Sequence, residues 1–160
     1  MQNRILICVF FAALLFSLCG CISISTKTEK TQDITIADVP QPARTMIEML
    51  TAGGQIRKLE KEQIGRKVIY DVEATVQGKD VEYDIASNGI VLTAQQSIEY
   101  NALPAAVQNA VQKYFGPATG LKAYREVEDG SVFYEIEGTK DNKPVALKLS
   151  CNGKIVEEER

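Results

Sequence analysis

The sequence contains no histidine and no tryptophan among its 160 residues. Without histidine the chain has no Ser-His-Asp triad, no Cys-His pair, no histidine metal ligand and no imidazole pH switch. Basic residues are not in excess either, because 18 Lys and Arg stand against 21 Asp and Glu, for a formal net charge of −3. This balance does not indicate nucleic-acid binding. We therefore predict neither histidine-based catalysis nor a nucleic-acid partner.

Long apolar runs are missing except near the N-terminus. Residues 5–18 form an apolar run after Arg4, shorter than the about 20 residues of a membrane span but typical of a secretory signal. The run ends at Leu18-Cys19-Gly20-Cys21, which resembles a bacterial lipobox. We interpret residues 1–20 as a lipoprotein signal peptide and Cys21 as the acylated cysteine. An ordinary signal peptide and an uncleaved anchor are the alternatives.

The residues after Cys21 indicate where in the cell the protein is located. Ile22, in place of Asp, resembles the outer-membrane sorting pattern, so we expect a lipid-anchored protein of the cell envelope that faces the periplasm. Residues 21–37 are rich in Ser, Thr and Lys without a helical stripe, which predicts a flexible tether. Cys151 is then the one cysteine left for the domain, and a single thiol forms no internal disulfide. Cys151 continues the alternation of the preceding strand, so we predict that it is a small buried residue on the helix-facing side of the sheet. A reactive thiol and a thiol paired between molecules are the alternatives.

The rest of the sequence repeats itself at an offset of 64 residues. Identical pairs without a gap include Pro40/Pro104, Lys58/Lys122, Glu62/Glu126, Val68/Val132, Tyr70/Tyr134, Glu73/Glu137, Lys79/Lys143, Asn88/Asn152 and Gly89/Gly153. The chain therefore contains a tandem repeat, with unit 1 over residues 38–97 and unit 2 over residues 98–160.

Each unit begins with an amphipathic helical pattern and continues with segments in which apolar and polar residues alternate. Apolar residues from Val39 to Leu50 and from Leu103 to Tyr114 follow helical spacing. Alternation of period two then predicts strands, and Asn88-Gly89 predicts a type I′ hairpin turn. The fold class expected is α+β, with two tandem units, each of one helix packed on a roughly four-stranded antiparallel sheet. Units of about 60 residues are marginal alone, so docking of the two, as one longer sheet, is a further hypothesis.

These residues resemble the PepSY-like domains, also described as beta-lactamase-inhibitor-like. Leu103-Pro104-Ala105-Ala106-Val107, Tyr134-Glu135-Ile136 and Asn152-Gly153-Lys154 match the family pattern well, and Val39-Pro40, Tyr70-Asp71-Val72 and Asn88-Gly89 match it more loosely. The resemblance implies an exported bacterial protein and the helix-plus-sheet fold. It also implies, by analogy with an inhibitor that has two such units, a joined concave sheet that grips an enzyme.

The predicted strands present a polar face away from the helices. It carries Lys58, Glu60, Glu62, Ile69, Asp71, Glu73, Glu82 and Asp84 in unit 1, and Lys122, Tyr124, Glu126, Phe133, Glu135, Glu137 and Lys148 in unit 2. Aromatic residues ringed by polar ones are typical of binding surfaces, and carboxylates favour a basic partner. The candidate partner-binding residues are Ile69, Asp71, Glu73, Tyr124, Phe133, Glu135 and Glu137. The alternative is a solvated face, charged to prevent sheet stacking.

We expect neither catalysis nor metal binding at this face. Acidic residues on adjacent strands suit Ca²⁺, but no EF-hand or other compact loop accompanies them, and nothing suggests the cleft that paired catalytic carboxylates require. We predict no catalytic residue, no metal site and no cofactor. The function expected is a non-catalytic envelope lipoprotein that binds another exported protein, such as a peptidase or other hydrolase, with inhibition and regulation both open. The alternatives are a structural or stress-related lipoprotein without a specific partner and a cation or small-ligand binding module.

Overall fold

The computed structural model describes residues 29–117 and 119–160. The predicted signal peptide, the lipidated Cys21 and the first part of the tether lie outside these residues. The later part of the predicted tether is not flexible, because it forms β1 (Glu29–Asp33) and a short 3₁₀ helix, η1 (Ile36–Asp38). β1 pairs with β2, and Ile34 and Ile36 pack against the first core cluster, so backbone pairing and apolar burial order this segment. No helix of the described part is long and apolar enough to cross a membrane.

Within the described residues, nine strands form one antiparallel sheet in sequence order from β1 to β9. The strands after β1 are β2 (Gln55–Ile64), β3 (Lys67–Val76), β4 (Lys79–Ala86), β5 (Val91–Ile98), β6 (Lys122–Glu128), β7 (Ser131–Lys140), β8 (Lys143–Ser150) and β9 (Ile155–Glu159). The prediction of two units, each a helix on its own roughly four-stranded sheet, is therefore wrong. β5 pairs with β6 over six residues, so the sheet continues across the boundary between the repeats.

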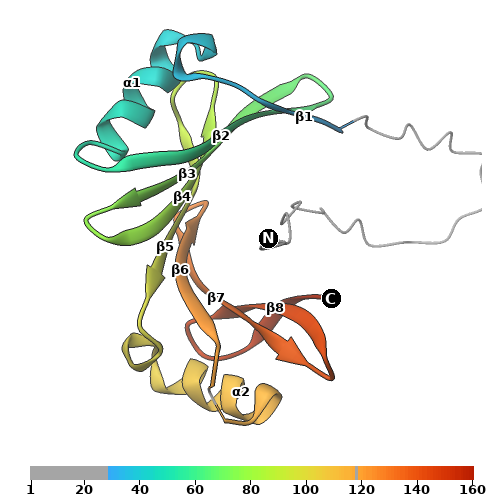
Figure 1. Cartoon of the computed structure of the whole chain (residues 1–160). Helices are drawn as coiled ribbons and strands as arrows, with labels where there is room; N and C mark the ends of the chain where they lie inside the picture. The colour runs from blue at the N-terminus through green and yellow to red at the C-terminus, as the bar shows by residue number, and fades with distance from the viewer. Residues whose placement is uncertain (1–28, 118) are drawn as a thin grey trace, which may run out of the picture.

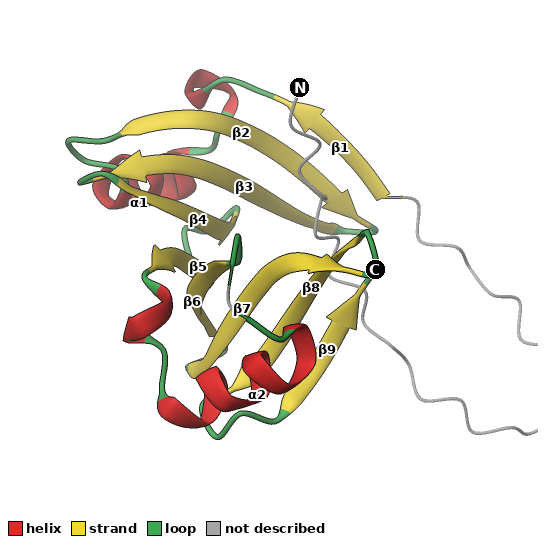
Figure 2. Cartoon of the chain, turned by 60° about the horizontal axis from the view of Figure 1, so that its bottom comes forward, coloured by secondary structure: helices red, strands yellow, loops and turns green. Residues whose placement is uncertain are grey.

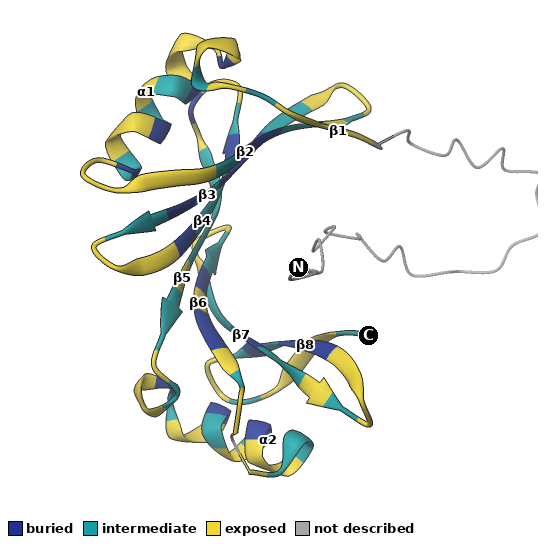
Figure 3. Ribbon diagram, viewed as in Figure 1, coloured by how far each residue is buried: buried dark blue, intermediate teal, exposed yellow. Residues whose placement is uncertain are grey.

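Two α-helices of the described chain, α1 (Gln41–Leu50) and α2 (Ala105–Phe115), lie on the outer side of the curved sheet (Figure 1). Ala43 and Ile47 of α1 pack on a cluster with Leu59, Val72 and Ile85. The equivalent cluster under α2 consists of Leu103, Val107, Val111, Ala123, Ile136, Val145, Leu147 and Leu149. The helical stripes predicted from the sequence are confirmed, because their apolar residues are the ones buried against the sheet (Figure 3).

The sequence repeat also appears in the positions of the helices and strands and in the pairing of the strands. β3 and β4 recur as β7 and β8 at the same offset of 64 residues, and α1 begins 64 residues before α2. The pairing of β1 with β2 also recurs, with Glu29↔Ile64 matching Thr93↔Glu128. β5 is consequently the last strand of the first repeat and the equivalent of β1 for the second. This shared strand is why the repeats form one sheet and not two.

The hairpin turns at Gly89 and Gly153 differ from the prediction. The Gly89 amide donates to the Ala86 carbonyl over 2.8 Å, and of the turn residues only Gly89 has a positive φ, of 85°. This is a type I turn followed by a glycine bulge, not a type I′ turn centred on Asn88-Gly89. In the second repeat β8 ends at Ser150 and Cys151 enters the corresponding turn. Cys151 is consequently exposed, and the prediction that it is buried is wrong.

Candidate functional site

The inner side of the curved sheet carries rows of side chains that lie directly opposite one another on adjacent strands. Residues paired in this way share a face of the sheet. The first row crosses β1 to β6 and is almost entirely acidic: Asp33, Glu60, Asp71, Asp84, Thr93 and Glu128. The second row crosses β2 to β8: Lys58, Glu73, Glu82, Gln95, Glu126, Phe133 and Ser150. The third crosses β5 to β9: Ser97, Tyr124, Glu135, Lys148 and Glu157.

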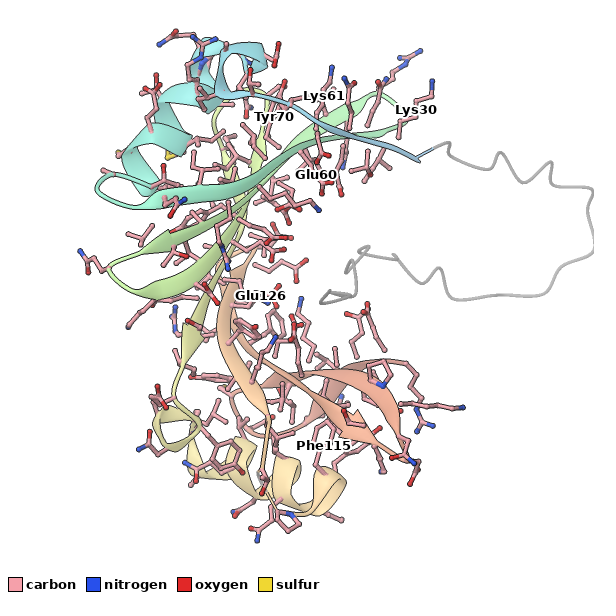
Figure 4. All side chains as sticks on the ribbon, in the orientation of Figure 1. Lys30, Glu60, Lys61, Tyr70, Phe115 and Glu126 are labelled. Atoms are coloured by element: carbon pink, nitrogen blue, oxygen red, sulfur yellow. The ribbon has the colours of Figure 1, made fainter. Side chains whose placement is uncertain are left out.

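We call the side of the sheet that carries these rows the concave face. Glu60 and Glu126, from opposite halves of the chain, both lie on this inner side (Figure 4). Side chains on the inside of a curved sheet converge, whereas those on the outside spread apart and leave room for the helices.

All seven predicted partner-binding residues lie on the concave face, but they do not form one patch. Tyr124 and Glu135 are directly opposite each other, on β6 and β7. Ile69 lies at one margin between Glu62 and Ala86. Glu137 lies at the other margin, where Lys122 pairs with it over 3.3 Å.

The concave face is less exposed than the sequence led us to expect. Tyr124 is only 6% exposed, Glu135 5% and Asp71 9%. Tyr124 is thus not an open aromatic anchor, because curvature brings neighbouring side chains over it. Phe133 is half-buried, and the Lys148 ammonium lies 4.8 Å from the centre of its ring, a cation–π contact.

One lysine neutralises carboxylates in the second repeat. The Lys148 ammonium contacts Glu126 at 2.9 Å and Glu128 at 2.5 Å. Burial alone would lower the pKa of Lys148, but the hydrogen bonds to Glu128 and Glu126 outweigh it and the pKa is raised. Lys148 therefore stays charged and holds β8 to β6 across the intervening strand.

Four other carboxyls on this face have strongly raised pKa values. Burial, reinforced by neighbouring carboxylates, raises the pKa of Asp71 to about 7 and that of Glu82 to about 8. The same causes raise the pKa of Asp84 to about 6, although a hydrogen bond with Thr93 opposes the rise. Burial and the nearby Glu126 raise the pKa of Glu135 to about 8, opposed by the hydrogen bond from Gln95, of 2.7 Å. Several of these groups are protonated near neutral pH.

Two of these carboxyls have an unpaired buried oxygen. Asp71 Oδ1 and Glu135 Oε1 have no hydrogen-bond partner in the described structure. A buried polar atom without a partner is costly. In the same residues, 29–117 and 119–160, no group of three or more Asp, Glu or Cys side chains is placed to hold a metal ion. The described part of the face is therefore rich in carboxyl groups but not arranged as a preformed metal site.

Sequence reasoning missed the contribution of Asp33, Thr93, Gln95 and Glu128 to this face. Asp33 was assigned to the tether, and β5 was read only as the end of the first unit. The 64-residue offset contained the signal, because it places β5 in the same relation to β6 as β1 has to β2.

Known structures share this fold. A protein from Bacteroides eggerthii, described as one of the "putative periplasmic proteins", matches with a TM-score of 0.59 at 13% identity, over 76% of this chain and 88% of that chain. A BLIP-like protein from Bacteroides fragilis matches with a TM-score of 0.55 at 18% identity, over 76% of this chain and 85% of the other. At these identities the likeness shows the fold alone.

Among the curated proteins, none matches this chain. The model of the family described as "Putative beta-lactamase-inhibitor-like, PepSY-like" matches residues 25–93 and 68–157, two overlapping segments that span most of the chain. The resemblance seen in the sequence is thus confirmed, and the chain belongs to the beta-lactamase-inhibitor-like, PepSY-like family.

Proposed function

We propose that the protein is a non-catalytic binding module of the bacterial envelope that holds a basic segment of another exported protein against its concave face. The observation that carries the proposal is the acidic row, in which five of the six positions from β1 to β6 are carboxylic acids. Like charges directly opposite one another on adjacent strands destabilise a sheet, and the first four positions of this row, from Asp33 to Asp84, are all acids. Such a row is explained if a cationic partner neutralises it.

The family match supports a binding function over catalysis. A BLIP-like protein is among the structures with the same fold, and by analogy of fold we propose that this chain acts by covering a surface of its partner. A peptidase or another hydrolase of the envelope is accordingly the class of partner we propose, with inhibition or regulation as the consequence of binding.

The proposal includes a lipid anchor at Cys21. An acylated Cys21 would hold the domain at the outer membrane, on its periplasmic side, where exported partners pass. Cys21→Ala should release the protein from the membrane fraction into the soluble fraction after cell lysis. Retention of the variant in the membrane fraction would contradict the anchor and leave the binding proposal to its own test.

The binding proposal is tested by crosslinking in the native envelope and identifying the captured proteins. Phe133 is the half-buried aromatic residue of the concave face, and Phe133→Ala should abolish capture of a specific exported protein with a basic surface. Met49→Ala is the matched control, because Met49 is a large apolar residue, 62% exposed on the outer helix α1. The same capture pattern for the wild type and both variants would instead support a structural lipoprotein without a specific partner.

A further inference from the structure

The two halves of the concave face differ in charge at several equivalent positions, and one of them is the position of Lys148. Lys148 on β8 lies directly opposite Glu135 on β7. The position 64 residues earlier is Asp84 on β4, directly opposite Asp71 on β3. The second repeat therefore supplies its own cation where the first repeat has another carboxylate.

The consequence is an excess of carboxyls over basic groups on the concave face of the first repeat. Asp84 lies directly opposite Asp71 and two positions along β4 from Glu82. Asp84 raises the pKa of both Asp71 and Glu82, and Asp71 raises the pKa of Glu82. Lys58 lies directly opposite Glu73 on this half of the concave face, and its ammonium is paired with Glu60 at 2.6 Å. Asp71 Oδ1 is buried without a partner, in a residue only 9% exposed.

The charged groups around Asp84 do not compensate it. They are Glu60 and Glu62 from β2, Asp71 and Glu73 from β3, Glu82 from β4, and Glu126 and Glu128 from β6. Lys148, which faces the same side from β8, is already held by Glu126 and Glu128. A cation that enters here would be attracted by every carboxylate of the row.

We propose that Asp71, Glu82 and Asp84 form a receptor site for one lysine or arginine side chain of the bound protein, whose positive charge takes the place that Lys148 occupies in the second repeat. This inference rests on the proposed function and names the chemistry of its contact. The site is a charge pair with an incoming side chain, and no bond is formed or broken.

The geometry favours a side-chain cation over a metal ion. Ca²⁺ takes about six to eight oxygen ligands at close range, and the described residues contain no group arranged to hold a metal. An ammonium donates three hydrogen bonds and a guanidinium five, which a few carboxyl oxygens on neighbouring strands are able to accept. Lys148 shows within this chain that a lysine on the concave face reaches carboxylates two strands away, on β6.

The experiment uses the full-length protein in a non-ionic detergent and two short probes, acetyl-tetralysine amide and acetyl-tetraglutamine amide. Binding is followed by NMR through the backbone amides of residues 71, 82 and 84. Asp84→Lys builds the lysine of the second repeat into the first, and Asp84→Asn removes the charge with little change of shape. Glu48→Lys is the matched control, since it makes the same charge change at an exposed position of α1.

We expect tetralysine to shift the amides of β3 and β4 in the wild type and in Glu48→Lys, and tetraglutamine to leave them unchanged. Asp84→Lys should weaken tetralysine binding by about tenfold or more, the usual order for loss of a buried charge pair. Asp84→Asn should weaken it by a smaller factor, which protects the test if Asp84→Lys fails to fold. Equal binding by all four proteins, shifts spread evenly over the surface, or shifts by CaCl₂ with none by tetralysine would overturn the inference.

Different results would refute the receptor site and the proposed function. If Asp84→Lys captures the envelope partner as the wild type does while Phe133→Ala does not, the receptor site is wrong and the binding face stands. If no partner is captured by the wild type, the proposed function is wrong whatever tetralysine does.

Discussion

Asparagine in place of Asp71 removes a buried negative charge from the centre of the acidic row. Burial and the carboxylates of Asp84, Glu73, Glu62 and Glu60 raise the pKa of Asp71 from 3.8 to about 7. The folded protein then binds more protons than the unfolded chain between about pH 4 and pH 7. The contribution of Asp71 to the free energy of unfolding therefore falls as the pH rises through that window and is level above it.

The magnitude follows from the size of that rise. One pKa unit corresponds to about 1.4 kcal/mol, so a rise from 3.8 to about 7 implies a penalty on the order of 4 kcal/mol for ionised Asp71. The asparagine of the variant is neutral at every pH and similar in shape to the aspartate. Because the structure relaxes around a buried charge, we expect Asp71→Asn to raise the free energy of unfolding by about 2–4 kcal/mol at pH 8.5 and to change it little at pH 4.

The assay is urea denaturation of the wild type and the variant at pH 4, 6 and 8.5. Asp141→Asn is the matched control, because Asp141 is exposed in the turn between β7 and β8, where asparagine tolerates the positive φ of 51°. A stabilisation by Asp71→Asn that does not depend on pH, or no stabilisation at pH 8.5, would refute the electrostatic account of the concave face.

Three further substitutions probe the fold. Lys148→Met leaves the buried Glu126 and the half-buried Glu128 without their cation and should lower the free energy of unfolding by about 3–5 kcal/mol at neutral pH. A loss below about 1 kcal/mol in urea denaturation, the range of a surface ion pair, would contradict this role. Gly153→Ala places a Cβ against the backbone of the first turn of α2 at a φ of 80°, so we expect a destabilisation of at least about 1–3 kcal/mol, and an unchanged thermal midpoint would be the contrary result. Ile47→Ala leaves a cavity at a fully buried position under α1 and should lower the free energy of unfolding, measured by calorimetry, by about 2–5 kcal/mol. A change as small as that of an exposed residue would contradict this expectation.

Much of the local structure could be predicted from the sequence. The helical spacing from Val39 to Leu50 and from Leu103 to Tyr114 predicted α1 and α2, because only that spacing turns the apolar residues to one side of a helix. The period-two alternation around Tyr70 and Tyr134 predicted β3 and β7 and assigned Asp71 and Glu135 to the face without helices. The repeat offset predicted that the two halves have the same elements in the same order.

Errors arose where a local pattern has more than one solution. Asn-Gly suits both a type I′ turn and a type I turn with a glycine bulge, and the bulge moved Cys151 out of the strand and into solvent. A polar segment such as Glu29–Asp33 becomes a strand only because the edge of β2 is available to pair with it. No amphipathic pattern of its own indicates this.

The sequence by itself determined both α-helices, the strands with alternating patterns, their sidedness and their duplication, because periodicity acts within a few positions along the chain. Only the tertiary structure decided that β5 is shared, that the repeats form one sheet, and that the sheet curves around its polar face. Curvature and edge pairing depend on strands far apart in sequence, and they bring acidic residues of different strands together, which raises the pKa values of Asp71 and Asp84. The same long-range arrangement sets Asp84 in the position that Lys148 holds in the other half.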